Sequence, residues 1–243
     1  MRRLLIVSLA LATACTPAVA PPAPPPAPAP AAVPLGLHWF RASAEQRAVY
    51  LQVYRGAGER LRALADSLPG GGWAVVLDAD ETVLDNSTYQ KRRAEAGLGF
   101  TQESWDAWVR EGAAPALPGA TEFTRLARSL GGRVAIVTNR DDEVCGDTRE
   151  NLRRVGVEAD VVLCRVGGVS DKNPRFRAVE TGTAAPGLPP LRVVMWVGDN
   201  IQDFPGLTQA VRSGPEAGFA EFGRRYFLLP NPMYGSWERN PPQ

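Results

Sequence analysis

Four short apolar runs constrain the fold of this chain more than any other feature of its sequence. They are WAVVL, RVAIV, DVVL and LRVVMWV, at residues 73–77, 133–137, 160–163 and 191–197. Each is too short for an ordinary helix and rich in β-branched residues, and none alternates with polar residues, which is typical of strands buried on both faces. Helical patterns lie between the runs, so the order predicts an α/β domain with a parallel sheet.

The first helical pattern follows Ser43, which has Gln46 three residues on as in a capping box. This pattern ends at the PGGG of residues 69–72, where the chain must turn. We expect further helices in three places: after Pro118, from Asp142 to Val155, and after Pro174.

Polar residues follow each predicted strand. The carboxyl ends of parallel strands meet at one edge of a sheet, where ligands bind in such folds, so these side chains should share one crevice. The residues at the four strand ends are Asp78, Asp80, Thr138, Asn139, Arg140, Lys172, Asp199 and Asp203. We expect the crowding of carboxylates there to raise the pKa of at least one of them.

The residue types at this edge suit carboxylate, hydroxyl and lysine chemistry. The only histidine, His38, is expected to be a surface or packing residue, which argues against a histidine-rich zinc site or a Ser–His–Asp triad. Carboxylate oxygens suit Mg²⁺, and a lysine and a threonine beside them indicate a phosphate pocket. An aspartate there can act as a nucleophile and form an aspartyl-phosphate. The net charge of +1, without a basic stripe, argues against a nucleic-acid polymer as partner.

The N-terminus predicts export. Residues 1–14 have two arginines and an apolar run too short to span a bilayer, which is typical of a signal peptide. The stretch LATAC resembles a bacterial lipoprotein cleavage site, at which Cys15 would be lipidated; ordinary cleavage near Ala20 is the alternative. Residues 15–37 would then comprise the lipidated cysteine and a Pro/Ala-rich tether, and residues 38–243 the globular domain.

The two remaining cysteines leave two alternatives open. Cys145 and Cys164 could form a disulfide in an oxidising compartment, or could be two separate buried thiols.

Several stretches together resemble the class C nonspecific acid phosphatases, which are bacterial lipoproteins of the haloacid dehalogenase superfamily. The stretches are VLDADETVLDNSTY (76–89), VTNR (137–140), KNPRF (172–176), VMWVGDNIQDF (194–204), WDAWV (105–109), PGATEF (118–123) and LLPNPMYGSWE (228–238). The resemblance covers residues 38–238. It implies a haloacid dehalogenase-like three-layer sandwich around a central parallel sheet, with a small, mainly helical cap inserted at about 86–116.

The resemblance also implies roles for the four aspartates. Asp78 would be the nucleophile and a metal ligand. Asp80 would be the general acid and then the general base, and its main-chain carbonyl would also bind the metal. Asp199 would be the third metal ligand, and Asp203 would hold a metal-bound water or orient Lys172. The alternative is that these residues only cap turns and helices at the strand ends.

Thr138 and Lys172 would bind phosphoryl oxygens, supported by Asn139 and Arg140. Alternatively, Lys172 could form a surface ion pair with Asp171, which contributes little energy.

Trp105 and Trp108 are three residues apart on one predicted helix, for which core packing is the ordinary explanation. The resemblance suggests instead that Trp105 and Tyr234 bracket an aromatic substrate group such as a nucleobase, a contact that tolerates different bases. Glu81 and Asp85 are interpreted as mainly structural.

The function implied is that of a Mg²⁺-dependent acid phosphatase acting on small phosphomonoesters, such as nucleoside 5′-monophosphates and aryl phosphates. It would be held at the bacterial cell envelope by its lipid anchor alone, at the outer membrane by analogy because Thr16 follows Cys15. A homodimer is a further expectation. The alternatives are a narrow-specificity envelope phosphatase of the same superfamily and a lipoprotein that binds nucleotides without turnover.

Overall fold

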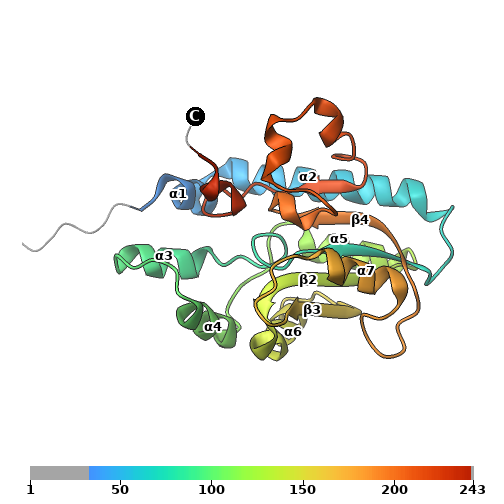
Figure 1. The fold of residues 1–243 in the computed structure, drawn as a ribbon, viewed down its shortest axis with the longest axis horizontal. Coiled ribbons are helices and arrows are strands. Elements are labelled where there is room, and N and C mark those ends of the chain that lie inside the picture. The colour runs from blue at the N-terminus through green and yellow to red at the C-terminus, as the bar shows by residue number, and fades with distance from the viewer. Residues whose placement is uncertain (1–32, 242–243) are drawn as a thin grey trace, which may run out of the picture. The chain divides into compact units, whose positions relative to one another are not determined.

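A five-stranded parallel sheet in the order β3-β2-β1-β4-β5 lies at the centre of the computed structural model, which describes residues 33–241 (Figure 1). The strands are β1 (Trp73–Leu77), β2 (Arg133–Asp141), β3 (Val161–Arg165), β4 (Arg192–Gly198) and β5 (Tyr226–Leu228). The four predicted strands are confirmed. β5 was not predicted because it has only three residues, of which Phe227 alone is buried.

Seven α-helices surround the sheet within the described residues. They are α1 (Leu35–Ala42), α2 (Ala44–Ala65), α3 (Ser87–Glu95), α4 (Gln102–Glu111), α5 (Ala120–Ser129), α6 (Cys145–Arg154) and α7 (Asn173–Thr181). Short 3₁₀ helices complete the structure: η1 (Asp142–Val144), η2 (Ile201–Asp203), η3 (Gln209–Ser213), η4 (Glu216–Phe219) and η5 (Ser236–Arg239).

The N-terminal end of α2 follows the predicted capping pattern in part. The Ser43 hydroxyl accepts a hydrogen bond from the Gln46 amide at 3.1 Å, which satisfies one of the free amides of the first turn. α1 was not predicted, and it begins at Leu35, within the segment that the sequence assigns to the tether.

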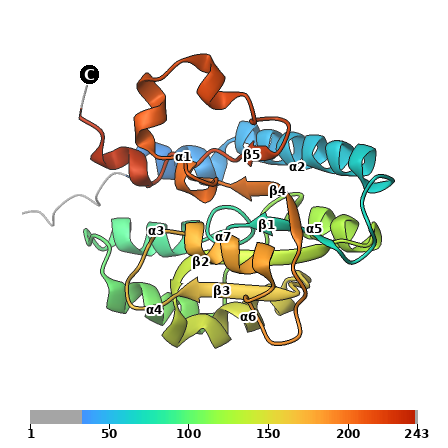
Figure 2. The same cartoon turned by 45° about the vertical axis from the view of Figure 1, so that its right-hand side comes forward.

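The alternation of side chains along β1 divides the core into the two halves of a three-layer sandwich. Trp73, Val75 and Leu77 pack with residues of α2, α5 and α6, whereas Ala74 and Val76 pack with residues of α7. All five residues of β1 are buried, which explains its uninterrupted apolar sequence. Figure 2 shows helices on both sides of the sheet.

Residues 86–116, predicted to form a cap, contain α3 and α4. The two segments that flank this stretch, which we call its stems, pair with each other at residues 83–84 and 116–117. Leu84 forms an isolated bridge with Ala116, and the Leu117 amide donates to the Val83 carbonyl at 2.9 Å. α3 and α4 lie together at one end of the sheet (Figures 1 and 2). The stems therefore fix where the insertion begins and ends relative to the sheet.

Cys145 and Cys164 form a disulfide that joins the start of α6 to β3, with 5.9 Å between their Cα atoms. The sequence left open whether these cysteines form a disulfide or remain two separate buried thiols, and the structure contains the disulfide.

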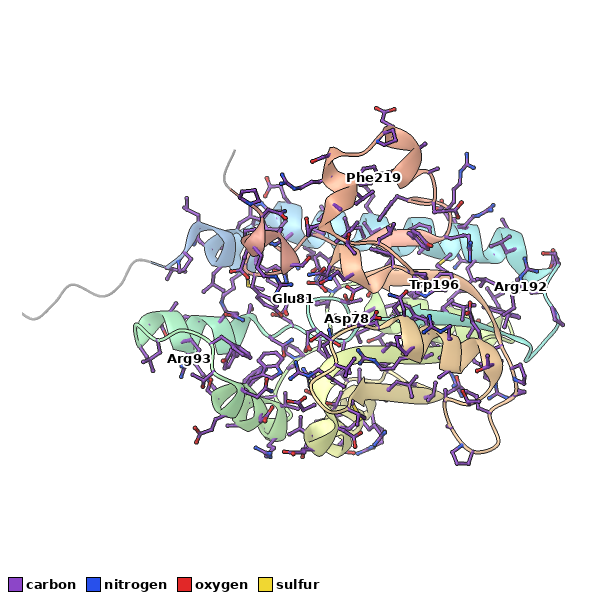
Figure 3. The ribbon with its side chains drawn as sticks, viewed as in Figure 1. Asp78, Glu81, Arg93, Arg192, Trp196 and Phe219 are labelled. Carbon is purple, nitrogen blue, oxygen red and sulfur yellow. A yellow bond between two sulfur atoms is a disulfide. The ribbon has the colours of Figure 1, made fainter. Side chains whose placement is uncertain are left out.

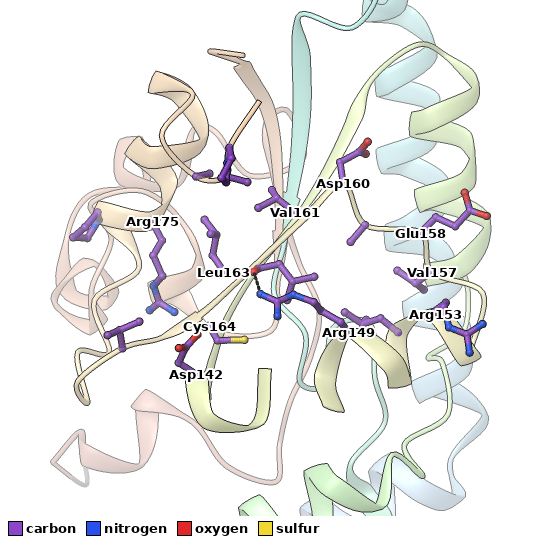
Figure 4. A pocket seen from close by; sticks show the side chains of 18 of the residues that line it. Asp142, Arg149, Arg153, Val157, Glu158, Asp160, Val161, Leu163, Cys164 and Arg175 are labelled. Carbon is purple, nitrogen blue, oxygen red and sulfur yellow. Dashed lines mark hydrogen bonds between the residues drawn. The ribbon is translucent and has the colours of Figure 1, made fainter. Parts of the chain in front are cut away.

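A cavity of about 860 Å³ forms a trough along the edge strand β3 and is walled by residues of α6 and the region around α7 (Figure 4). The Arg149 guanidinium crosses it and donates to the Val162 carbonyl at 3.2 Å. A charged side chain in this position hinders another strand from adding to the sheet.

Within residues 33–241, no helix has both the length and the apolar character needed to cross a membrane. The predicted signal peptide (1–14), Cys15 and most of the tether lie outside the described residues.

Candidate active site

Three carboxylates gather at the carboxyl edge of the sheet. Asp78 directly follows β1, Asp199 directly follows β4, and Asp203 ends η2. One carboxylate oxygen of each lies within 4.8 Å of those of the other two. β1 and β4 are neighbours in register, with Leu77 opposite Val197, so the residues that follow them emerge side by side. The convergence predicted from strand order is therefore present for these residues.

The turn after β4 brings Asp203 back to the sheet. Its Oδ2 accepts the Asn200 amide at 2.9 Å, so the residue caps η2 as the alternative interpretation expected. A side chain at Gly198 would overlap Asp203, and a glycine is therefore needed at this position. The other carboxylate oxygen, Oδ1, is left for the site.

Lys172 lies inside the carboxylate cluster. Its ammonium is 2.5 Å from Oδ1 of Asp78 and 2.6 Å from Oδ1 of Asp203. The side chain is buried, and the Asp171 carboxylate accepts the Asn173 amide at 2.9 Å instead. The alternative of a surface ion pair between Lys172 and Asp171 is therefore wrong.

Burial governs the titration of this cluster. It raises the pKa of Asp78 to about 7, and the charges of Asp203 and Asp80 add to the effect against the opposing influence of Lys172. Burial, followed by the charges of Asp203 and Asp78, also raises the pKa of Asp199. Burial by itself would lower the pKa of Lys172, but the two carboxylates raise it overall. The site keeps an excess of negative charge beside one ammonium, which favours a bound cation.

The carboxylate of Asp80 lies outside the cluster. Its Oδ1 accepts hydrogen bonds from Arg140 Nε at 2.8 Å and from Asn86 Nδ2 at 2.9 Å. Arg140 Nη2 also donates to Asn86 Oδ1 at 3.1 Å, and the Arg140 side chain is completely buried. Arg140 thus supports Asp80 and the start of the insertion. A metal contact by Asp80 through its main-chain oxygen stays a prediction.

Thr138 and Asn139 differ in their access to the site. The Thr138 side chain is buried, and its hydroxyl accepts the Arg140 amide at 3.2 Å. Asn139 lines the cavity at the site, whereas Thr138 and Arg140 do not.

A cavity of about 540 Å³ opens over the cluster. Predicted site residues in its wall are Asp78, Asp80, Trp105, Asn139, Lys172, Asp199, Asp203 and Tyr234. Sequence reasoning missed other residues of the wall, among them Gln90, Phe100, Gln102, Arg165, Met233 and Glu238. The larger trough along β3 contains none of the clustered carboxylates.

The aromatic residues of this cavity differ greatly in exposure. Trp105 is only 8% exposed, with the Tyr89 ring edge-on at 5.1 Å and the Arg140 guanidinium 5.6 Å from its ring centre. Phe100, in the loop between α3 and α4, is 63% exposed. Tyr234 donates its hydroxyl hydrogen to the Glu81 carboxylate. Phe100 therefore offers more ring surface to a ligand than Trp105 does.

Glu81, which is labelled in Figure 3, contacts both Tyr234 and Asn86 through its carboxylate. It is completely buried and has a left-handed φ of 50°, which is uncommon for a residue other than glycine. Its carboxylate also accepts the Asn86 amide at 2.8 Å. Burial, and then the charges of Asp80 and Asp199, raise its pKa well above the usual value. Glu81 thus links the loop after β1 to Tyr234, in keeping with its structural interpretation.

The fold and the acidic cluster together define a haloacid dehalogenase-like α/β protein. Residues 8–237 match the model of the family described as HAD superfamily, subfamily IIIB (acid phosphatase), and the chain belongs to this family. The fold expected from the resemblance is thereby confirmed.

Two solved structures of the class C acid phosphatase from Bacillus anthracis are similar to this chain. One has a TM-score of 0.74 and 32% identity, and the other, with tungstate bound, has 0.73 and 31%; each match covers 84% of this chain and 85% of that one.

Curated plant proteins are more distant relatives. Acid phosphatase 1 of Solanum lycopersicum is 29% identical over 167 residues, or 65% of this chain and 57% of that protein. The stem 31 kDa glycoprotein of Glycine max is 27% identical over 65% of this chain and 58% of that protein. The matches therefore span less than two thirds of these relatives.

Proposed function

We propose that this chain is a Mg²⁺-dependent acid phosphatase that hydrolyses phosphomonoesters, including nucleoside 5′-monophosphates and aryl phosphates. One observation carries the proposal. Lys172, Asp78 and Asp203 are in direct contact beside Asp199 in the wall of one open cavity. The ammonium would bind phosphoryl oxygens next to the attacking carboxylate.

The donor set fits a hard divalent cation. The carboxylates of Asp78 and Asp199 and the main-chain carbonyl of Asp80 would hold it. Three carboxylate oxygens within 4.8 Å of one another match the oxygen ligands that Mg²⁺ prefers. When bound, the metal would reduce the repulsion between Asp78 and a phosphate dianion.

Asp78 would attack phosphorus while the bond between phosphorus and the leaving oxygen breaks, and Asp80 would protonate that oxygen. Asp80 would then take a proton from water as the water attacks the aspartyl-phosphate, which releases inorganic phosphate and restores Asp78. The hydrogen bonds from Arg140 and Asn86 would hold the Asp80 carboxyl in place for both steps.

The leaving group would occupy the outer part of the cavity, bracketed by Trp105 and Tyr234. Because little of Trp105 is exposed, the exposed ring of Phe100 adds a third aromatic surface. If Trp105→Ala leaves the KM for a nucleoside monophosphate unchanged while Phe100→Ala raises it, Phe100 replaces Trp105 as the stacking residue.

The enzyme would work outside the cytoplasm, lipid-anchored through Cys15 at the outer membrane. The disulfide between Cys145 and Cys164 supports an oxidising compartment. A Cys15→Ser protein that partitions with membranes as the wild type does would refute this anchor. The expected homodimer can be tested by light scattering.

The direct test is phosphate release from p-nitrophenyl phosphate at mildly acidic pH, with Mg²⁺ or a chelator and with an Asp78→Asn control. We expect activity that requires both the metal and Asp78, and a loss of at least about 1,000-fold in the variant. A panel of phosphomonoesters then separates a broad phosphatase from a narrow one. Nucleotide binding without phosphate release in every condition would contradict the proposal.

A further inference from the structure

Arg175 lies on α7, one turn after Lys172, and contacts both the last part of β2 and the loop between β3 and α7. Its Nη1 donates to the Thr138 carbonyl, and its Nη2 lies 2.5 Å from Asn139 Oδ1. Nη2 also lies 3.4 Å and 3.3 Å from the carbonyls of Ser170 and Asp171, just before Lys172. One guanidinium thus joins the end of β2 at Thr138 to the loop that leads to Lys172.

Neither segment takes part in the regular pairing between β2 and β3. The register between β2 and β3 breaks between Val137 and Asp141, so residues 138–140 leave the regular ladder. The loop before Lys172 exposes Val166 and Val169 to solvent and therefore gains little from core packing. Both segments depend on specific polar contacts for their position.

The contact with Thr138 also sets the direction of a backbone donor. The described chain has no cis peptide bond, so the Thr138 carbonyl and the Asn139 N–H point in opposite directions. Because Arg175 holds that carbonyl, the Asn139 N–H is directed away from α7. Asn139 lines the cavity above the carboxylates, where a fixed N–H can serve an oxyanion.

Arg175 is half-buried, and both terminal nitrogens of its guanidinium donate to these oxygens rather than to the acidic cluster. Burial lowers its pKa, and the nearby Asp78 opposes this change. Within residues 33–241, Arg175 makes no hydrogen bond or ion pair with any of the clustered carboxylates. Figure 4 shows its side chain extending from α7 beside β3, on the trough side of these loops.

We propose that Arg175 is a positioning residue that preorganises the oxyanion-binding part of the site without acting on the metal-binding part. Its planar fork suits several carbonyl oxygens at once, whereas a lysine in its place could satisfy only some of them. Substitution should therefore weaken the binding of a tetrahedral oxyanion and leave cation binding intact. The proposal deepens the proposed function and rests on it for the identity of the ligand.

The experiment compares Arg175→Ala, Arg175→Lys and Arg177→Ala with the wild-type protein. Arg177 is an exposed arginine of the same helix whose side chain makes no hydrogen bond or ion pair to any residue of the described range, which makes it a matched control. The readouts are the Kd for tungstate by calorimetry, the Mg²⁺-induced rise in Tm, and kcat and KM for p-nitrophenyl phosphate.

For Arg175→Ala we expect tungstate binding and kcat/KM to weaken by about 10-fold or more, with a Mg²⁺-induced Tm rise within about 2-fold of wild type. The tungstate affinity and kcat/KM of Arg175→Lys should lie between those of Arg175→Ala and wild type, and Arg177→Ala should match wild type. Wild-type tungstate binding in Arg175→Ala, or an equal loss of tungstate and Mg²⁺ binding, would overturn the proposal. If Arg175→Ala does not fold, the test uses Arg175→Lys instead. Its tungstate Kd and its Mg²⁺-induced rise in Tm are each compared with the wild-type values.

The outcomes separate this proposal from the proposed function. A wild-type protein that hydrolyses nothing but binds tungstate in an Arg175-dependent way would refute the phosphatase activity and support the positioning role. If the wild-type protein hydrolyses the ester and Arg175→Ala behaves identically, the phosphatase activity is supported and the positioning role is refuted. A wild-type protein that binds no tungstate would overturn the positioning role.

Discussion

The ammonium of Lys172 lies 2.5 Å from Oδ1 of Asp78, although the two residues are 94 positions apart in the chain. Asp199 and Asp203 lie in the same cluster, so a single ammonium, in contact with Asp78 and Asp203, serves a group of three carboxylates of which these two are buried. The excess negative charge makes this region costly to bury without a cation, and it makes the cluster sensitive to pH.

Mg²⁺ should therefore stabilise the protein, and more at about pH 7.5 than at about pH 5. The pKa of Asp78 is raised from 3.8 to about 7, so between these values the native state holds a proton that the unfolded chain has released. The contribution of Asp78 to stability therefore falls as the pH rises from about 4 to about 7. A cation that takes the place of this proton binds better above that pH range.

The measurement is the Mg²⁺-induced change in Tm at the two pH values. Asp78→Asn serves as control, since its Mg²⁺-induced change should be smaller and less dependent on pH. A change in wild type that is as large at pH 5 as at pH 7.5 would contradict this prediction.

Replacing Arg140 by Gln should destabilise the protein by about 3 kcal/mol, because Asp80 and the buried Asn86 lose the hydrogen bonds of a completely buried guanidinium. Arg140 holds Asp80 and Asn86 together and is completely buried. We also expect kcat to fall at least about 10-fold, since Asp80 would lose its orientation. Urea unfolding and steady-state kinetics measure the two effects. Arg153→Gln, on exposed α6 surface, should change stability by less than about 0.5 kcal/mol.

Removing the disulfide with Cys145→Ser and Cys164→Ser together should cost about 3 kcal/mol, because the bond closes a loop between residues 19 positions apart. The expected fall in Tm is roughly 6–12 °C for a domain of this size. Reductant should lower the Tm of wild type toward that of the double variant and should leave the variant unchanged. Equal Tm values for oxidised and reduced wild type would show that the bond contributes nothing.

Asp160→Asn should make stability less dependent on acid pH. Burial opposes ionisation of Asp160, but hydrogen bonds from the Val134 amide, Arg133 and Arg128 outweigh it and lower its pKa. A lowered pKa gives stability that is present above the unfolded value of about 4 and is lost as pH falls through the native value.

We expect Asp160→Asn to destabilise by roughly 1–2 kcal/mol at about pH 7, with the difference shrinking as the pH falls through the lowered native pKa of Asp160. Chemical unfolding across this range measures it. Glu158→Gln removes a mostly exposed carboxylate nearby and should show no such trend. A constant difference between Asp160→Asn and wild type at every pH would mean that the charge of Asp160 is not the cause.

The sequence alone determined four of the five strands and the edge of the sheet on which the site lies. WAVVL could only be a strand buried on both faces, and parallel strands place the residues that follow them at one edge, so Asp78, Lys172 and Asp199 could be placed together. These inferences need only burial pattern and chain order, which are local properties of the sequence.

The tertiary structure alone decided which partner each side chain takes. Asp80 contacts Arg140 rather than the carboxylate cluster, and Trp105 is largely buried rather than exposed to the cavity. Arg175 joins the end of β2 to the loop before Lys172. The same residue types could equally have taken other partners in a different arrangement of the chain. Cys145 and Cys164 likewise paired only because α6 and β3 are neighbours in space. The direction of a side chain depends on contacts with segments distant in sequence, and hydrophobic periodicity and residue spacing carry no record of them.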